Sequence, residues 1–334
     1  MSDSLSTPKV SILIPVHNVE KYVERCILSV LGQTMQEGVE VIILNDCTPD
    51  RSMEIIQSVL QTHLKKSRIA VRIIEHERNR GQAAARNTLI SHAKGEYILF
   101  IDSDDYIDSN MLEKMYSKAV ETGADIVMVD VMLEYSNEQR IHKAPFYTEK
   151  EKVLRCIIRG ENSYLWNKLT RRSLYTDNDI SFTEEMDVSE DYGVIVPLCY
   201  IANKIEHASS VFYHYIQYNT LSITKRNITQ KKIDGWLYHV RKIEELLIEK
   251  EIKGYDLDIT YQKLEIRVQC MKRTTGRMQQ EYSHLSPEIT LYKWKLLRFF
   301  PGRTYKILMF LALFGYPRLF NFLLKTTSLL GKKY

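Results

Sequence analysis

The first 135 residues alternate between short apolar runs and longer segments whose apolar residues recur every three to four positions. Short runs rich in Val, Ile and Leu are typical of buried β-strands, and the longer spacing is typical of amphipathic helices. Strands that alternate with helices build right-handed β-α-β units, in which helices cover both faces of a parallel sheet. The pattern therefore predicts an α/β fold with a mostly parallel, Rossmann-like central sheet. The predicted strands are Val10–Pro15, Val39–Leu44, Val71–Ile74, Tyr97–Ile101 and Ile126–Leu133, and two of the predicted helices are Gly81–Ala93 and Asn110–Glu121.

The alternation fades after about Asn137, and helical spacing returns from Ile233 onward. Between these points the chain is mixed, with aromatic and acidic clusters. We therefore expect an α/β domain over residues 1–224, followed by a C-terminal helical region over residues 225–334.

Charge is distributed unevenly along the chain, although the formal net charge is only +4. Residues 289–334 contain nine Lys or Arg and no Asp or Glu, so this tail carries +9 and the rest of the chain carries −5. The mildly acidic body argues against a nucleic-acid-binding protein. The tail is rich in aromatic residues, and its longest apolar run, Ile307–Tyr316, is shorter than the roughly 20 residues that span a bilayer. This composition favours a segment lying on an anionic membrane, although the same residues could pack the tail on the α/β domain.

The five cysteines are an odd number at wide spacings, and no CxxC motif occurs. This usage is typical of a reduced cytosolic protein, not of a disulfide scaffold or a zinc module. The polar segment Met1–Lys9 lacks the apolar core of a signal peptide. We expect a cytoplasmic protein, with the tail as a peripheral contact to the cytoplasmic face of the membrane.

Polar and acidic residues follow four of the predicted strands. Ligands bind outside the carboxyl ends of the strands in open parallel sheets. A sheet needs turns at this edge, but it does not need so many carboxylates, so we expect the functional site here. The segments are Pro15–Asn18, Asn45–Asp50, Glu75–Gly81 and Asp102–Asp105.

The run Asp102–Asp105 places three carboxylates within four residues. Such groups repel each other unless a cation or hydrogen-bond donors compensate. Mg²⁺ is commonly held by one or two carboxylates together with substrate phosphates. The alternative is an acidic turn in which Ser103 or Asp105 caps the following helix.

Four segments in unbroken order resemble the family 2 glycosyltransferases, which are inverting enzymes with the GT-A fold. The similarity covers about the first 110 residues, and weaker matches continue to Thr224. The resemblance implies a nucleotide-sugar half over about residues 1–110 and an acceptor half over about residues 111–224. The later segment Leu165–Leu169 also resembles one that is common in family members that build bacterial surface polysaccharides. The matching segments are Val10–Asn18, Asn45-Asp46, Gly81 with Ala85–Asn87, and Gly95–Asp105.

The resemblance assigns the first two loops to the nucleotide. It implies that Pro15, His17, Asn18 and Glu20 line the nucleotide pocket. It also implies that Asp46 accepts a hydrogen bond from a uracil-type base, and the donor is therefore expected to be a UDP-sugar.

The resemblance assigns later residues to the ribose, the diphosphate and a divalent metal. It implies that Gly81 and Arg86 lie beside the base and ribose. Asp102, Ser103 and Asp104 match the DxD motif, with Asp102 near the ribose and Asp104 on a Mn²⁺ or Mg²⁺ ion. Both aspartates are expected metal-site residues.

The segment Ser189–Tyr192 resembles the family's Glu-Asp motif, which implies that Asp191 deprotonates the acceptor hydroxyl. A sugar hydroxyl is a poor nucleophile, so the chemistry requires a general base near its proton. The adjacent Glu190 and Asp191 could raise each other's pKa, which would suit such a base. The alternative is a solvated acidic stretch, because Glu184 and Glu185 lie close by.

We therefore expect a metal-dependent inverting glycosyltransferase that acts on a glycan or lipid-linked acceptor. Two other classes remain open. A nucleotidyltransferase would normally carry a glycine-rich phosphate loop after the first strand, where this chain has Pro15–Asn18. A non-catalytic nucleotide-sugar or membrane-binding relative could lose Asp104 or Asp191, and both are present.

Overall fold

The computed structural model describes residues 7–186, 188–219, 228–296 and 303–329. Contacts divide the chain into two compact units. The α/β unit comprises residues 1–154 and 162–221, and the helical unit comprises residues 155–161 and 222–334. The domain boundary expected at residues 224/225 lies outside the described residues.

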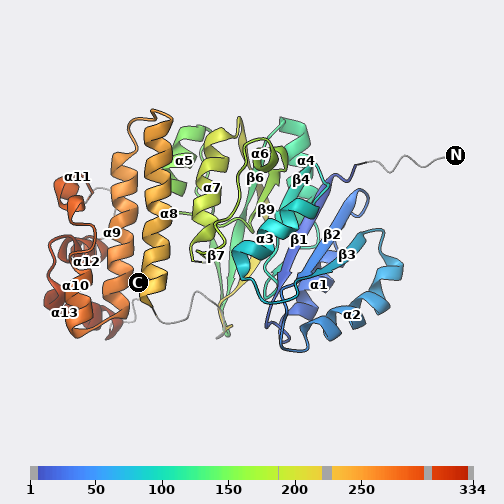
Figure 1. Ribbon diagram of the computed structural model, residues 1–334, viewed down its shortest axis with the longest axis horizontal. Helices are drawn as coiled ribbons and strands as arrows, with labels where there is room; N and C mark the ends of the chain where they lie inside the picture. Colours follow the sequence, from blue (N-terminus) through green and yellow to red (C-terminus); the bar gives the residue numbers. More distant parts are fainter. Residues whose placement is uncertain (1–6, 187, 220–227, 297–302, 330–334) are drawn as a thin grey trace. The chain divides into compact units, whose positions relative to one another are not determined.

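The α/β unit is built on one nine-stranded sheet with the order β3-β2-β1-β4-β8-β6-β9-β5, and β7 pairs with β6 (Figure 1). The predicted α/β class is therefore confirmed. The five predicted strands correspond to β1, β2, β3, β4 and β6, and their bounds differ from the prediction by one residue at most. The strands are β1 Val10–Val16, β2 Val39–Asn45, β3 Ala70–Glu75, β4 Tyr97–Phe100, β5 Tyr106–Ile107, β6 Ile126–Glu134, β7 Gln139–His142, β8 Lys168–Arg171 and β9 Ile205–Ile216.

Strands β1, β2, β3 and β4 are parallel, and Ile12 pairs with Val41 on one side and with Leu99 on the other. The sheet then becomes mixed, because β8 lies antiparallel between β4 and β6. The sequence pattern did not predict β8, which has only four residues. Four residues are too few to show a period of two above the background.

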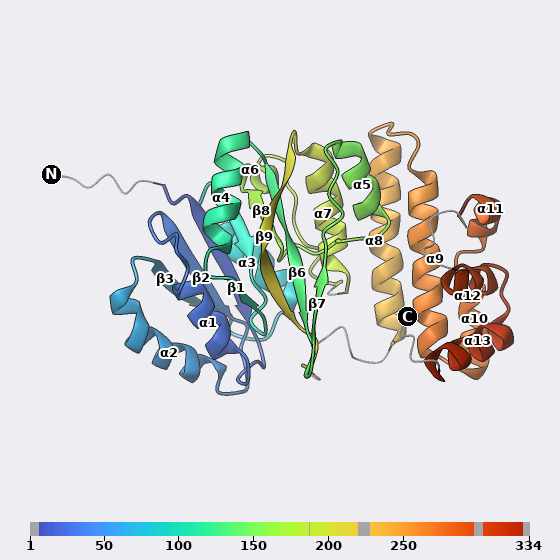
Figure 2. The ribbon, with the colours of Figure 1, turned by 180° about the vertical axis from the view of Figure 1, so that it is seen from behind.

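Helices cover both faces of the sheet: α3 and α7 lie in front of it in Figure 1, and α1 and α4 lie in front of it in Figure 2. Alternate residues of a strand point to opposite faces. Ile12 and Ile14 belong to a core shared with α1, α2 and α4, and the intervening Leu13 is also fully buried. The helices of this part of the chain are α1 Val23–Leu31, α2 Ser52–His63, α3 Gln82–His92, α4 Met111–Thr122, α5 Lys150–Ile158, α6 Ser173–Thr176 and α7 Glu190–Ile201, and a short 3-10 helix, η1, spans Leu64–Lys66.

The helical unit is organised around α9. Leu264 and Val268 of α9 are buried against Leu308 and Ala312 of α12, and Phe320 of α13 completes the cluster. Apolar residues of the basic tail therefore form part of the core of this unit. Its elements are α8 Gln230–Glu249, α9 Asp256–Arg273, α10 Gly276–Tyr282, η3 Pro287–Tyr292, α11 Lys293–Leu296, α12 Arg303–Leu313 and α13 Pro317–Leu329.

Within the described ranges, the structure contains no helix of sufficient length and apolarity to cross a membrane.

Candidate active site

The loops that follow β1 and β2 are bonded to each other at the carboxyl edge of the sheet. The backbone N–H of Asn18 donates to Oγ1 of Thr48 at 2.7 Å, and the backbone N–H of Glu20 donates to Oδ2 of Asp50 at 2.8 Å. Asn18 has a φ of 58°, a left-handed conformation that asparagine tolerates better than most residues. Local polar groups therefore fix the shape of the predicted nucleotide loop.

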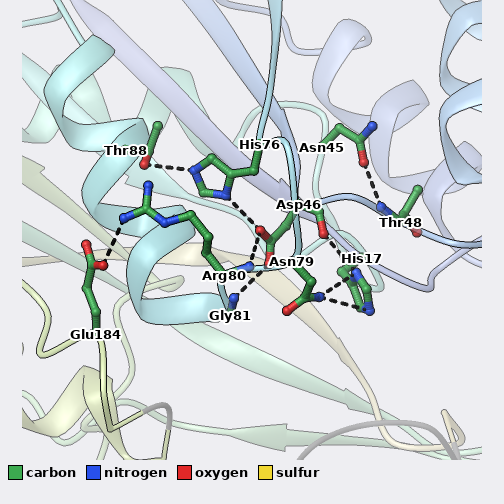
Figure 3. Close-up of polar contacts among 10 residues, drawn as sticks. All are labelled: His17, Asn45, Asp46, Thr48, His76, Asn79, Arg80, Gly81, Thr88 and Glu184. Atoms are coloured by element: carbon green, nitrogen blue, oxygen red, sulfur yellow. Dashed lines mark hydrogen bonds and ion pairs between the residues drawn. The ribbon is translucent and has the colours of Figure 1, made fainter.

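Asp46 is the centre of a hydrogen-bond cluster at this edge (Figure 3). Its carboxylate is almost fully buried and accepts from the backbone N–H groups of Arg80 and Gly81, both at 2.9 Å. His76 donates from Nδ1 to Oδ1 of Asp46 at 2.7 Å. The carboxylate therefore fixes the turn that begins α3, where Gly81 has a φ of 85° that favours glycine.

The same cluster contains polar residues to which the sequence analysis gave no role. Nε2 of His76 lies 3.0 Å from Oγ1 of Thr88, and Nδ2 of Asn79 lies 2.9 Å from Nδ1 of His17. The guanidinium of Arg80 donates to Glu184 at 2.9 Å (Figure 3). His76 lies in the segment Glu75–Gly81 that follows a predicted strand, and this position was the only signal for it.

Arg86 joins the two halves of the predicted site. Its side chain is 1% exposed and lies in α3, where it donates to Asp102 at 3.1 Å and to Glu190 at 2.8 Å. It also donates to Asp191. A buried guanidinium is stable only when its charge is paired, and three carboxylates supply the pairing here. The structure thus brings Arg86, Asp102, Glu190 and Asp191 into one ionic cluster.

Asn87, the next residue of α3, holds the chain that precedes α7. Its side-chain amide donates to the carbonyl of Phe182 at 2.9 Å and accepts from the N–H of Phe182 at 2.8 Å. The ring of Phe182 lies edge-on to that of Phe100 in β4, and the guanidinium of Arg86 lies 5.5 Å from its centroid. The segment that leads to Glu190 and Asp191 is therefore fixed to α3 and lies against β4.

Residues of β9 form hydrogen bonds to the acidic loop after β4. The hydroxyl of Tyr213 accepts from the backbone N–H of Asp102 and donates to Oδ2 of Asp105, both at 3.0 Å. Oδ1 of Asp105 accepts from the N–H of Ile216 at 2.8 Å. Asp105 and Ser103 are buried. Asp105 therefore anchors the loop, while Asp102 and Asp104 are partly exposed.

Asp104 is bonded to a residue 115 positions further along the chain. Nδ2 of Asn219 donates to Oδ2 of Asp104 at 2.8 Å, and Asn219 is 3% exposed. The sequence analysis gave no role to Asn219, since no local pattern relates it to Asp104. The segment that follows β9 thus supplies a partner of the second DxD aspartate.

The candidate base lies in the first turn of α7, which Glu190 and Asp191 begin. Besides the bond from Arg86, the Asp191 carboxylate accepts from the backbone N–H of Leu165 at 3.1 Å. The Asp191 carboxylate is therefore held in place by α3 on one side and by the turn before β8 on the other.

The turn that presents the Leu165 N–H is held by a fully buried lysine. Nζ of Lys168 donates to the carbonyls of Asn162 and Tyr164, at 2.8 and 2.6 Å, and to Oδ1 of Asn167 at 2.8 Å. The three donors of an ammonium group match these three acceptors. Burial nevertheless lowers the pKa of Lys168 to about 7.

Burial also raises the pKa of several carboxyl groups in the site. The pKa of Asp102 is raised to about 6, with Arg86 opposing the shift and Asp104 adding to it. Burial raises the pKa of Asp104, while the hydrogen bond from Asn219 lowers it. Burial raises the pKa of Glu190 in the same way, against the charge of Arg86.

Apart from Ser103, which is buried in the acidic loop, the predicted site residues therefore fall into three groups. Arg86, Asp102, Glu190 and Asp191 form the ionic cluster. A second group surrounds Asp46, and a third is the pair of Asp104 with Asn219. The second group contains His17 and Gly81 by hydrogen bonds, Asn18 and Glu20 by the bonded loops, and Pro15 by its place near the end of β1.

A mostly parallel sheet with a DxD loop after β4 and a carboxylate pair on a later helix defines the GT-A class of protein. Residues 11–183, more than half of the chain, match the family model described as Glycosyl transferase family 2. The chain belongs to this family.

Two relatives align with part of this chain. The uncharacterized glycosyltransferase EpsJ of Bacillus subtilis (strain 168) is 35% identical over 194 residues, which are 55% of this chain and 54% of EpsJ. TarS of Staphylococcus aureus (strain Mu50), a poly(ribitol-phosphate) beta-N-acetylglucosaminyltransferase, is 27% identical over 209 residues, 62% of this chain and 35% of TarS. The aligned segments thus cover about half and one third of these relatives.

Solved structures share the fold across nearly the whole chain. A crystal structure of S. aureus TarS 1-349 with UDP-GlcNAc superposes with a TM-score of 0.71 and 18% identity, covering 98% of this chain and 93% of that one. The mannosyltransferase PcManGT from Pyrobaculum calidifontis, solved with GDP-Man and Mn²⁺, gives a TM-score of 0.54 at 14% identity, with 95% and 88% covered. At these identities the likeness shows the fold.

Proposed function

We propose that this protein transfers a sugar from a UDP-sugar to a hydroxyl group of a surface-polymer or lipid-linked glycan, with inversion at the anomeric carbon. The observation that carries the proposal is the ionic cluster of Arg86. One guanidinium bonds Asp102 of the donor-side loop and both acids of α7. Donor site and base must be adjacent in such an enzyme, because the attacking hydroxyl and the anomeric carbon meet between them.

The choice of UDP rests on Asp46 and on the relatives. A carboxylate at the edge of the sheet can accept from the imide N–H of uracil. The solved TarS structure contains UDP-GlcNAc, and TarS acts on poly(ribitol-phosphate) by its name. These relationships support a UDP-sugar as donor and a polyol-phosphate or polysaccharide chain as acceptor.

The residues of the acidic loop fit a divalent cation. Asp102 and Asp104 carry pKa values raised by burial and, for Asp102, by the neighbouring carboxylate, and a hard cation would relieve this cost. The described residues contain no cluster of three or more His, Cys, Asp or Glu side chains that could hold a metal, so diphosphate oxygens and water would complete the coordination. A bound Mn²⁺ or Mg²⁺ supplies Lewis-acid stabilisation of the departing diphosphate.

Two residues of the cluster, Asp191 and Arg86, have defined tasks in this reaction. Asp191 takes the proton of the acceptor hydroxyl as general base. Arg86 and the N–H of Leu165 orient the Asp191 carboxylate. Arg86 therefore acts as a positioning residue for the base, in addition to lying on the donor side. Attack from the side opposite the departing diphosphate inverts the anomeric centre.

The proposal is tested by incubating the protein with Mn²⁺, a short ribitol-phosphate or glycan acceptor, and a panel of UDP-, GDP-, CDP- and ADP-sugars. Release of the nucleoside diphosphate is then measured. We expect release from a UDP-sugar, and its loss in Asp104→Ala. Release from a non-uridine donor alone would overturn the UDP assignment, and binding of a donor without release in the presence of each acceptor class would favour a non-catalytic protein.

A further inference from the structure

Helix α13 presents two different faces. One face is packed: Phe320 is fully buried, and Leu323 and Leu324 lie against the core of the helical unit. The other face is exposed and carries Leu319 and Phe322, which are 56% and 68% exposed. The packed face already accounts for the folding of the helix, so the exposed apolar side chains serve no packing role among the described residues.

Positive charge flanks the exposed apolar side chains. Arg318 and Lys325 are exposed and lie one turn before and almost one turn after Phe322. The four residues at positions 318, 319, 322 and 325 recur at helical spacing and therefore share one side of α13. We call these four residues the outer face of α13.

Exposed apolar and basic residues also occur close to the outer face of α13 in the sequence. Tyr316, in the turn before α13, is 50% exposed, and Ile307 of α12 is 49% exposed beside the exposed Lys306. Helices α12 and α13 contact each other. No Asp or Glu occurs anywhere in residues 289–334, so no acidic side chain of this segment neutralises these cations.

We propose that the outer face of α13 binds the surface of an anionic membrane. Cations beside large apolar residues on one helix face match the interface between anionic headgroups and acyl chains. A second copy of this chain is a poorer occupant for a symmetric contact, because the two basic segments would then meet with like charge. The inference is independent of the sugar-transfer proposal, since it uses none of the active-site residues.

The packing of the tail determines how this is tested. Deleting residues 289–334 would remove Leu308, Ala312 and Phe320 from the core of the helical unit, so loss of binding could reflect unfolding. Substitutions on the outer face avoid this problem, because their side chains are exposed. The matched control is Ile248→Ser. Ile248 is an apolar residue of α8 in the same unit, is 77% exposed, and does not belong to the outer face of α13.

The experiment is flotation of the full-length protein with vesicles of phosphatidylcholine alone or with one third phosphatidylglycerol. We expect at least tenfold tighter binding to the anionic vesicles, weakened by 0.5 M NaCl, which screens the charges. The double variant Leu319→Ser/Phe322→Ser and the variant Arg318→Glu/Lys325→Glu should each lose at least tenfold in binding. Ile248→Ser should bind like the wild type, and all variants should keep their thermal midpoint and UDP release.

Three results would overturn the proposal. Equal binding to both vesicle types would exclude recognition of anionic lipid, and unchanged binding of the outer-face variants would exclude this face. Concentration-dependent dimerisation that Leu319→Ser/Phe322→Ser abolishes, without vesicle binding, would assign the face to self-association. Because UDP release is measured without lipid, failure here leaves the sugar-transfer proposal standing, and the reverse is also true.

Discussion

Arg86 donates a hydrogen bond from Nη1 to the carboxylate of Asp191, 105 positions away in the sequence. The guanidinium is buried and belongs to α3, and the carboxylate lies in the first turn of α7. The same guanidinium reaches Asp102 in the DxD loop. The geometry of the candidate base therefore depends on a residue that also contacts the DxD loop, and under the proposed function donor binding and proton transfer would depend on the same guanidinium.

Replacing Arg86 by lysine should impair both turnover and stability. Lysine keeps the charge but cannot make the forked contacts to three carboxylates. We expect kcat for UDP release to fall at least about tenfold, which corresponds to about 1.4 kcal/mol of barrier. We also expect the free energy of unfolding to fall by about 3 kcal/mol, because buried carboxylates lose their partner. Urea denaturation and steady-state kinetics measure the two effects.

The control for this variant is Arg51→Lys, in which an exposed arginine paired with Glu54 changes in the same way. An exposed pair contributes about 0–1 kcal/mol, so its stability should change little. If Arg86→Lys were as mild as Arg51→Lys, the ionic cluster would not support the site.

Replacing Asp46 by asparagine should weaken nucleotide binding. The two carboxylate oxygens of Asp46 accept hydrogen bonds from the N–H groups of Arg80 and Gly81. In asparagine an –NH₂ group replaces one of these oxygens, so at least one hydrogen bond at the start of α3 is lost. We expect the Kd for UDP, measured by calorimetry, to rise at least tenfold, about 1.4 kcal/mol. The stability should fall by about 1–3 kcal/mol because a buried donor loses its acceptor. Glu54→Gln on the exposed face of α2 should change neither quantity.

Replacing Asn219 by alanine should alter the dependence on the divalent cation. Nδ2 of Asn219 is the side-chain donor that orients Asp104. Without this hydrogen bond we expect the Mn²⁺ concentration for half-maximal UDP release to rise by about three- to tenfold. Effects of this order are typical when a metal-binding side chain loses the hydrogen bond that orients it. Asn178→Ala, which removes a hydrogen bond to a helix carbonyl far from this loop in sequence, is the control. Identical Mn²⁺ curves for wild type and Asn219→Ala would argue against a supporting role.

Because Lys168 is buried with a lowered pKa, we expect the free energy of unfolding to depend on pH. Folding lowers its pKa from the ordinary 10.5 to about 7. Between these values the unfolded chain holds a proton that the folded chain has released, so the free energy of unfolding rises with pH in this window. The penalty for burying the charge is fully present below about pH 7.

The comparison is between wild type and Lys168→Met, by urea denaturation at pH 7, 8 and 9. The wild type should gain stability relative to the variant by up to about 1.4 kcal/mol per pH unit. Parallel stability curves would show that Lys168 does not change its protonation in this range.

Much of the fold was predictable because both faces of the central strands are buried. Burial on both faces makes a strand read as a continuous apolar run, which is how β1, β2 and β4 were identified. The place of the site followed from topology, since polar residues after parallel strands collect at one edge. The side chains of Asp46 and Asp102 do lie at this edge.

The parts that could not be predicted depend on long-range contacts. Arg86 lies in an alanine-rich helix whose sequence gives no sign that an arginine is buried, because the three carboxylates that pair with it come from distant segments. Asn219 becomes relevant only when β9 returns to the DxD loop. Strand β8 is short, and its first residue, Lys168, is a buried charge that local patterns assign to the surface.

The most direct test of the account is UDP release by Asp191→Asn with a UDP-sugar, acceptor and Mn²⁺, compared with wild type at saturating donor. The substitution removes the proton acceptor but keeps the size of the side chain. Because a general base contributes about 10²–10⁴-fold, we predict that kcat falls at least about 100-fold. The Kd for UDP should stay within about threefold, since the uridine is assigned to other residues. Release at the wild-type rate by Asp191→Asn would contradict the assignment of the base and, with it, the proposed mechanism.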